Sequence, residues 1–365
     1  MSATGVLDHP ADTGVISVLE LGACRPDAEA LRRATRRLHR KAMVIAGLAI
    51  ASYLGLVFFA HGPLVALPLA AVLVVALIAT GTCVMHDANH GAFGPSARLN
   101  RTVAFSADLL GASSWLWRNK HNAIHHGNTN VVGVDTDIEQ MPFARLAPAQ
   151  PWRPWHKYQH VYIWALYGFL TAQWVLFSDF ACLVSRRIGS QPLHRRPRRR
   201  DVAYLLAGKV VHLGWAVALP LMFHRWWVVI AFYFGCSWLV GFVLAVFFQV
   251  AHCVDIVEFA DETTSRRGND FVTHQLRTTA NVDCRSSFLG RPVAWMMGGL
   301  HHQIEHHLAP GMPHSAYGAM GEQVHELCAT RGIEYRVHPG FWSALASHAR
   351  WLRQMGRGIE SNDPS

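Results

Sequence analysis

The chain has 365 residues, of which 51% are hydrophobic and only 16% are charged, and its formal net charge is +9. This composition excludes a disordered chain, which needs low hydrophobicity and high charge. It is also poor in charge for an ordinary soluble domain, which carries roughly 25% charged residues. A purely apolar helical bundle would have little use for the 23 histidines. The composition therefore indicates a membrane protein with a histidine-rich part that binds a ligand.

The basic residues gather in two runs, at 32–41 and at 194–200, each directly before an apolar stretch. Basic runs in this position set membrane topology, and we predict that both lie in the cytoplasm and that the protein has no nucleic-acid partner. The seven cysteines are widely spaced and form no CxxC motif. Neither a disulfide framework nor a cysteine-based zinc site is therefore expected.

Residues 1–41 are predicted to form a polar cytoplasmic leader, after which the chain becomes apolar. The stretches 42–60 and 63–85 contain no charge. At about 1.5 Å per residue the second is about 34 Å long, enough to cross a hydrocarbon core of about 30 Å. The residues between them have the composition of a turn, so the two stretches predict a transmembrane hairpin.

Three further apolar stretches follow, at 161–184, 203–223 and 226–250. The first contains Gln173 and Asp179, and the second contains Lys209 and His212. If both basic runs face the cytoplasm, an even number of crossings must lie between the first hairpin and the second run. Only one apolar stretch is available there, so the first of the three is predicted to lie in the membrane interface. The other two are expected to form a second hairpin.

These elements predict an all-α membrane protein with four transmembrane helices in two hairpins and a cytoplasmic helical cap. The central domain is expected at 42–320, and a cytoplasmic C-terminal segment at 321–365. This topology places the histidines after the first hairpin and those after the second on the same side of the membrane, where one site can use both sets.

The histidines form three clusters, at 86–90, 121–126 and 301–307. Each cluster contains a pair four residues apart, which an α-helix places on one face: His86 and His90, His121 and His125, and His302 and His306. One ion needs only three or four protein ligands, so two metal ions fit this number of histidines better. Imidazole suits Zn, Cu, Fe and Ni alike. HExxH is absent, which argues against a zinc protease.

Four carboxylates lie close to these clusters in the sequence: Asp87, Asp135, Asp137 and Glu305. We expect them to accept the ring N–H that a ligating histidine does not use for the metal, which fixes its tautomer. For Asp135 and Asp137, an ordinary role at a helix start or in a loop is an equal alternative.

The clusters HDANH, HNAIHH and QIEHH resemble the three histidine boxes of the membrane fatty acid desaturase family. The stretch from Thr278 to Asn281 and the stretch from Pro310 to Tyr317 are also similar to family segments around the third box. The QIEHH form resembles the front-end and bacterial acyl-desaturase branch. The resemblance implies a non-haem di-iron centre that uses O2 to remove two hydrogens from a long acyl chain, and a desaturase domain that covers the central domain.

By position, the resemblance assigns eight metal ligands: His86, His90, His121, His125, His126, His252, His306 and His307. Either Gln303 or His302 is a further ligand, because this chain reads GGLHHQIEHH where the family commonly reads GGLN-x-QIEHH. The residues expected to support the ligands are Asp87, Asn281, Glu305 and Asp137.

The resemblance also implies partners. No G-x-G-x-x-G motif follows a predicted strand, so the electrons are expected from an external donor, a ferredoxin or similar carrier with its reductase. The substrate acyl group is carried on CoA, on acyl-carrier protein or on a lipid. The expected location is a bacterial-type inner membrane, with the active site on its cytoplasmic face.

Three alternatives remain open. A related hydroxylase or acetylenase would use the same oxidant on the same chain. A membrane metal transporter would need ligands at mid-bilayer depth, whereas these clusters lie beyond the helix ends. A membrane haem protein would need paired histidines on facing helices rather than HxxxHH groups.

Overall fold

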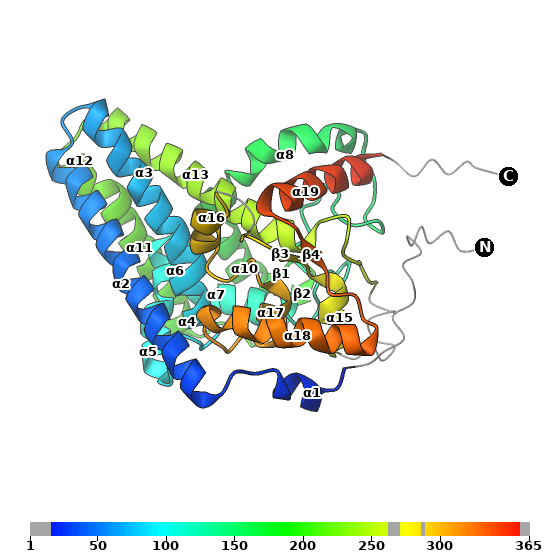
Figure 1. Cartoon of the computed structure of the whole chain (residues 1–365). Coiled ribbons are helices and arrows are strands. Elements are labelled where there is room, and N and C mark those ends of the chain that lie inside the picture. Colours follow the sequence, from blue (N-terminus) through cyan, green and yellow to red (C-terminus); the bar gives the residue numbers. More distant parts are fainter. Residues whose placement is uncertain (1–15, 194, 262–270, 286–288, 358–365) are drawn as a thin grey trace.

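The computed structural model describes residues 16–193, 195–261, 271–285 and 289–357. Within these ranges the chain is mostly helical, and its only sheets are two pairs of short strands. Figure 1 shows the long helices on one side of the molecule and the shorter helices on the other. The first fifteen residues of the predicted leader, His194 of the second basic run and the last eight residues of the chain lie outside the described residues.

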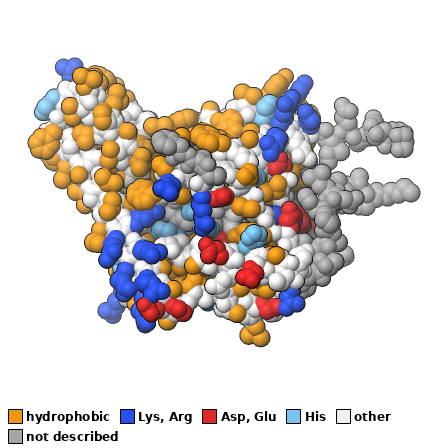
Figure 2. All heavy atoms as spheres, viewed as in Figure 1, with side chains coloured by type: hydrophobic (Ala, Val, Ile, Leu, Met, Phe, Trp, Pro, Cys, Tyr) orange, Lys and Arg blue, Asp and Glu red, His pale blue; other side chains and the backbone are white. Residues whose placement is uncertain are grey.

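Four helical stretches are long and apolar enough to cross a membrane: Ala28–Phe59, Pro63–Asn89, Arg199–Leu221 and Trp226–His252. Each overlaps one of the four predicted transmembrane segments, and the first and third end one and two residues before the predicted ends. Many of their large apolar side chains point outward, and Leu64 is 91% exposed. Figure 2 shows hydrophobic side chains covering much of this side of the molecule. A continuous exposed apolar surface of this kind is the surface that a bilayer covers.

The first of these helices begins earlier than the sequence pattern predicts. A short helix α1 (Val18–Ala23) precedes α2 (Ala28–Phe59), which starts where the Asp27 side chain accepts a hydrogen bond from the backbone N–H of Ala30 at 2.7 Å. Arginine and alanine are good helix formers, so the basic run continues the membrane helix. Several turns of α2 therefore lie within the segment assigned to the leader.

The helices of the first half continue as α3 (Pro63–Ala79), the π-helix η1 (Thr80–Met85), α4 (His86–Asn89), α5 (Ala97–Ala104), α6 (Ser106–Leu109), α7 (Ser114–Arg118), the π-helix η2 (Asn119–His125), the 3-10 helix η3 (Pro154–Tyr158), α8 (Gln159–Tyr167), α9 (Leu170–Gln173), the π-helix η4 (Trp174–Ser178) and α10 (Asp179–Ser185). The helices of the second half are α11 (Arg199–Leu213), the π-helix η5 (Gly214–Ala218), α12 (Leu219–Leu221), α13 (Trp226–His252), α15 (Phe271–Thr278), α16 (Gly290–Met297), α17 (Gln303–Leu308), the 3-10 helix η6 (His314–Ala316), α18 (Tyr317–Arg331) and α19 (Phe341–Gly356). Strands β1 (Arg187–Ile188) and β2 (Gln191–Pro192) pair antiparallel, and β3 (Asn281–Val282) and β4 (Val337–His338) pair parallel.

The apolar stretch predicted to lie in the interface is a bent pair of helices. Its two arms, Pro154–Tyr167 and Leu170–Ser185, meet at 72°. Gly168 lies at the bend, where an added Cβ would come within 2.0 Å of the Trp238 ring. Only glycine therefore lets α13 approach the bend so closely, and the bend prevents a single straight crossing.

Two cores hold the cap against the long helices. The larger joins α13 to α3, α8 and α19 and contains the fully buried Leu244 and Leu352. The second lies beneath α18 and includes Leu276, Ile304 and Tyr317. Together they fix α17 and the end of α13, which both carry histidines, on either side of the same interior space.

Candidate metal centre

Eight histidines from four parts of the chain meet in the interior. The first part is the extension of the α3 span through η1 and α4, which carries His86 and His90. The second is η2 with the residue after it, the third is the end of α13 with His252, and the fourth is α17. These are the eight residues that the sequence assigns as ligands, and the structure brings all of them together.

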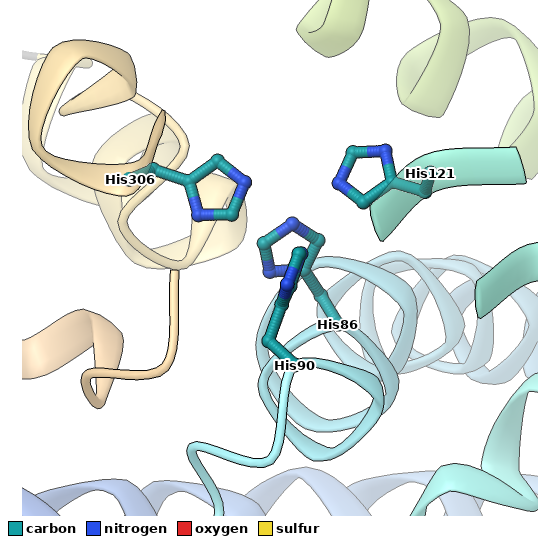
Figure 3. Close-up of side chains that lie close together, drawn as sticks. All are labelled: His86, His90, His121 and His306. Atoms are coloured by element: carbon teal, nitrogen blue, oxygen red, sulfur yellow. The ribbon is translucent and has the colours of Figure 1, made fainter. Parts of the chain in front are cut away.

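Four of these histidines form one group that can hold an ion: His86, His90, His121 and His306. Each offers a ring nitrogen, and these nitrogens lie within 4.8 Å of one another. Figure 3 shows the four rings, which come from three separate helical segments, converging on one space. Four imidazoles around one point suit a first-row transition metal.

A second group lies directly beside the first. It consists of His125, His252 and His307, with the same spacing between ligand atoms. His126 joins the two groups, since it also forms a ligand set with His306 and His307. Two adjacent groups built from eight histidines can hold two neighbouring ions.

The second histidine box, at 121–126, lies in the π-helix η2 and the residue after it, rather than in the α-helix that the spacing predicts. The backbone N–H of His126 bonds to the carbonyl of His121 at 3.0 Å, which is the i to i+5 pattern of a π-helix. The wider turn places both later rings beside the first one, with centroids 5.2 Å (His125) and 4.7 Å (His126) from that of His121. The π-helix thus lets one turn supply three rings.

The free ring nitrogens fit a metal. Among the described residues, both ring nitrogens of His86, the Nε2 atoms of His90, His306 and His307 and the Nδ1 atoms of His126 and His252 are buried without a hydrogen-bond partner. A buried polar atom without a partner is costly, and seven such nitrogens within one cluster of rings indicate a ligand that satisfies several of them. Imidazole nitrogens are donors for Fe, Zn, Cu and Ni.

Three of the eight rings are held in place by neighbours through their Nδ1 atoms. His125 Nδ1 lies 2.9 Å from the carboxylate of the fully buried Asp135. His307 Nδ1 lies 2.9 Å from Gln275 Oε1, and His306 Nδ1 lies 3.1 Å from the Tyr317 hydroxyl. Such partners orient the ring and direct its other nitrogen to the metal.

Asp87 connects the first histidine box, at 86–90, to the segment that follows the third box. Its Oδ2 accepts hydrogen bonds from the backbone N–H of His314 at 3.0 Å and from the His314 ring at 2.9 Å. Its Oδ1 lies 3.6 Å from His86 Nδ1. Asp87 therefore ties the start of α4 to the segment after the third box, and it lies close to a ligating ring as the sequence predicts.

Asp137 lies at the edge of the centre. Its carboxylate is 3.6 Å from His125 Nδ1 and 3.9 Å from His121 Nδ1, and it forms an ion pair with Lys120 at 2.8 Å. Asp137 also forms a candidate ligand set with those two histidines. The carboxylate is thus near enough either to orient the two rings or to share a metal with them.

Asn281 and Glu305 support the helix that carries two ligands rather than a ligand ring itself. Glu305 accepts hydrogen bonds from the Tyr335 hydroxyl at 2.9 Å and from the Asn281 amide at 2.8 Å. The Asn281 side-chain oxygen accepts the backbone N–H of Ile304 at 2.9 Å. These bonds fix α17, which carries two ligands, rather than a ring nitrogen of one of the eight histidines.

The structure separates the two candidates for a further ligand. Gln303 is buried, its Oε1 has no hydrogen-bond partner among the described residues, and it lines the same cavity as His121 and His252. The ring of His302 is 24% exposed and lies 3.7 Å from Glu305. His302 belongs to none of the ligand sets found in the described part of the chain.

Burial keeps most of these rings neutral. Burial, and then the charge of neighbouring rings, holds the pKa of four of them well below the ordinary value: His90, His126, His306 and His307. Burial likewise lowers the pKa of His121 to about 3. Burial also opposes protonation of His125, but the carboxylates of Asp135 and Asp137 outweigh it and raise the pKa. Neutral imidazole is the form that binds a metal.

A cavity of about 560 Å³ adjoins the histidines, and we call it the main cavity. His121, His125 and His252 form part of its wall, and its other walls are largely aliphatic and aromatic. Phe143, Phe169 and Phe177 line it and are also more than half exposed. The main cavity therefore reaches from the histidines to an apolar surface, a shape that suits a long hydrocarbon chain.

Comparison with known proteins gives a single family. The fatty acid desaturase family model matches residues 61–339. The sn-1 linoleoyl-lipid 6-desaturase of Synechocystis sp. is 33% identical over 291 residues, which are 78% of this chain and 79% of the relative. This chain belongs to the fatty acid desaturase family.

Two further relatives extend the comparison. The acyl-lipid (8-3)-desaturase of Physcomitrium patens is 32% identical over 321 residues, covering 87% of this chain and 66% of the relative. The sn-1 linoleoyl-lipid 6-desaturase of Arthrospira platensis is 30% identical over 286 residues, covering 78% and 76%. The expected resemblance is confirmed, and the protein is a membrane acyl desaturase and hence an oxidoreductase.

Four residues of the desaturase centre have roles that the sequence did not assign: Thr129, Gln275, His314 and Tyr317. Thr129 Oγ1 lies 3.1 Å from His307 Nδ1 and donates to Gln275 Oε1 at 2.9 Å. His314 and Tyr317 both lie in the stretch after the third box that resembles the family, and this similarity was the available signal. No local pattern marks Gln275, because its partner is 32 residues away.

Proposed function

We propose that this desaturase introduces a double bond into a long acyl chain of a membrane lipid, with O2 as the oxidant and two iron ions bound by the eight histidines. One observation carries the proposal: two adjacent sets of buried imidazoles adjoin a largely apolar cavity, and seven ring nitrogens of the eight histidines lack a partner among the described residues. The names of the relatives support a lipid-bound substrate.

The reaction balances as follows. Two hydrogen atoms leave neighbouring carbons of the chain and a C=C bond forms. O2 takes up these hydrogens with two electrons and two protons and becomes two water molecules. No side-chain base removes hydrogen from an unactivated C–H bond, and the iron pair supplies the oxidising power when bound.

The protein's own residues orient the ligand rings, bind the acyl chain and exclude water. Asp135, Gln275 and Tyr317 hold ring nitrogens so that the opposite nitrogens point into the centre. The apolar walls of the main cavity hold the chain extended against the histidines and keep water from the reacting carbons. The exposed aromatic residues at its edge would let a chain slide in from the bilayer while its headgroup stays outside.

The electrons come from a separate carrier, a ferredoxin or similar protein with its reductase. Exposed arginines at the start of α2, among them Arg32, Arg36 and Arg40, offer a basic surface. Leu38 of this helix packs in one cluster with Ala88 of the first box, so the surface lies close to the centre. Opposite charge steers such encounters. We place this surface and the centre on the cytoplasmic face of a bacterial-type inner membrane.

Fatty acid analysis of a host that expresses the gene tests the proposal. We expect a new double bond in chains released from membrane lipids, and none in cells that express His121→Ala at equal level. A hydroxylated or acetylenic product would assign the related reaction instead. New product confined to acyl-CoA or acyl-carrier protein during a short isotope pulse would overturn the lipid-bound substrate.

A further inference from the structure

A buried ion pair lies beside the main cavity, outside the histidine centre. Lys209 Nζ of α11 is 2.6 Å from Asp179 Oδ2 at the start of α10, and the two residues are 7% and 6% exposed. Lys209 lies within a helix apolar enough to cross a membrane. Charges in such helices are costly, and those that persist mark positions with a function.

Every proton of the ammonium group has an acceptor. Besides Asp179, Lys209 donates to the carbonyl of Gly111 at 2.6 Å and to the carbonyl of Trp174 at 2.8 Å. An ammonium group has three N–H donors and no acceptor, so these bonds complete its set. We call Lys209, Asp179 and their partners Gly111, Ser113 and Trp174 the Lys209 junction.

One partner belongs to a wall of the main cavity. Trp174 begins η4, and Trp174 and Phe177 of this π-helix both line the main cavity. The carbonyl that Lys209 binds is therefore part of the turn that presents these two rings. On its other side the same arm is held by the Thr171 hydroxyl, which donates to the carbonyl of Ser237 at 2.9 Å.

The other side of the junction belongs to the histidine wall. Asp179 Oδ2 also accepts the backbone N–H of Ser113 at 2.9 Å, and Ser113 caps the start of α7. Helix α7 runs directly into η2, which carries His121 and His125. The junction thus joins the aromatic wall of the main cavity to the segment that holds box-two ligands.

We propose that Lys209 and Asp179 are positioning residues that fix where along the acyl chain the double bond forms. The distance between the aromatic wall and the histidines decides which carbons lie against the centre, and the ion pair sets this distance. This inference rests on the proposed function. A misplacement of about 1 Å can change a rate by about a hundredfold, so a loosened wall would admit neighbouring positions.

Two variants distinguish an effect on the position of the double bond from an effect on the stability of the fold. Lys209→Met removes the donor and leaves a buried carboxylate without its cation, which is strongly destabilising. The double variant Lys209→Met with Asp179→Asn removes both charges and keeps an acceptor for Ser113. Arg195→Met is the matched control, because it breaks an ion pair with Asp201 of the same helix α11, at 2.5 Å, and neither of these residues lines the main cavity.

The readout is the position of the double bond, from mass spectrometry of derivatised fatty acids. We expect a roughly tenfold rise in the ratio of misplaced to correctly placed double bonds in the double variant, and none in Arg195→Met. Hydrogen exchange of residues 166–178 should be faster in the double variant, while its iron content stays that of the wild type. If Lys209→Met does not accumulate, the double variant alone decides.

The inference is overturned if the folded double variant makes its product at the wild-type position, even in smaller amount, because the ion pair then only stabilises the fold. A wild-type protein that makes no double bond would instead contradict the proposed function. The two failures are thus distinguishable in one experiment.

Discussion

The histidine centre and the Lys209 junction are both buried and polar, but they differ in what their atoms lack. In the centre, seven ring nitrogens of the eight histidines have no partner among the described residues, while the Nδ1 atoms of His125, His306 and His307 are held by neighbours. At the junction, Lys209 has an acceptor for each of its three protons.

A cluster that is open on one side is built to bind, since its missing partners must come from a ligand. A cluster that is closed is built to hold parts of the chain in place. The same contrast extends to His348 in α19, whose Nδ1 lies 2.7 Å from the carbonyl of Cys253 and whose Nε2 lies 2.8 Å from the Tyr167 hydroxyl. Both of its ring nitrogens are used, so His348 is structural although it is as buried as the ligands.

The largest effect is expected from removing a ligand that belongs to two sets. His121 contributes both to the four-histidine group and to the set with His125 and Asp137. His121→Ala should lower desaturation by at least about a thousandfold, roughly 4 kcal/mol, and should lower bound iron. The measurements are product formation in membranes and metal content of the purified protein. Wild-type iron with wild-type product would show that the open cluster is not the metal site.

A substitution in a closed cluster, such as the one around His348, should change the stability of the fold rather than metal binding. Burial lowers the pKa of His348 to about 4, below the ordinary value of about 6.5. Between these two pH values the unfolded chain therefore binds a proton that the folded chain does not bind. The free energy of unfolding falls as the pH falls from 6.5 to 4, by up to about 3 kcal/mol. Thermal unfolding of wild type and His348→Leu across this range should show a shallower pH dependence in the variant. Parallel curves would contradict this role.

A smaller effect is expected at the supporting layer of the centre. Asp135→Asn keeps the shape but weakens the acceptor that orients His125. Loss of such a partner costs about 10- to 100-fold in metal affinity or activity. Metal titration of the variant measures it, with the exposed Asp283→Asn as the control. An effect as large as that of His121→Ala would mean that Asp135 itself binds the metal.

The smallest effect is expected at His302. Its ring lies beside Glu305 and outside the ligand sets, so His302→Ala should change product and iron by less than about twofold, within the range of a surface substitution. Gln303→Ala, in the wall of the main cavity, should change them more. The reverse order would make His302 the further ligand.

The sequence was informative wherever the signal is local. The four long helices follow from long apolar stretches, three of them uncharged, and the histidine boxes follow from short spacings. Seven of the eight assigned ligands lie in these boxes, and His252 lies just after a predicted helix, 226–250. These features depend on periodicity and hydrophobicity, which neighbouring residues determine.

The contacts that complete the site are long-range, and no local pattern contains them. The bond between Asp87 and His314 joins residues 227 positions apart, and that between Lys209 and Asp179 spans 30. The sequence showed Lys209 and Asp179 as isolated charges in apolar stretches without showing that they pair. The π-helical turn of box two was also missed, because α-helical spacing explained the same histidines equally well.

The most direct test of the histidine centre is the metal content of the full-length wild-type protein, purified in detergent and measured by elemental analysis. Two adjacent ligand sets predict about two iron ions per chain, little zinc, and no haem absorbance. One metal ion per chain, or a haem spectrum, would contradict the assignment of the eight histidines to a two-iron centre.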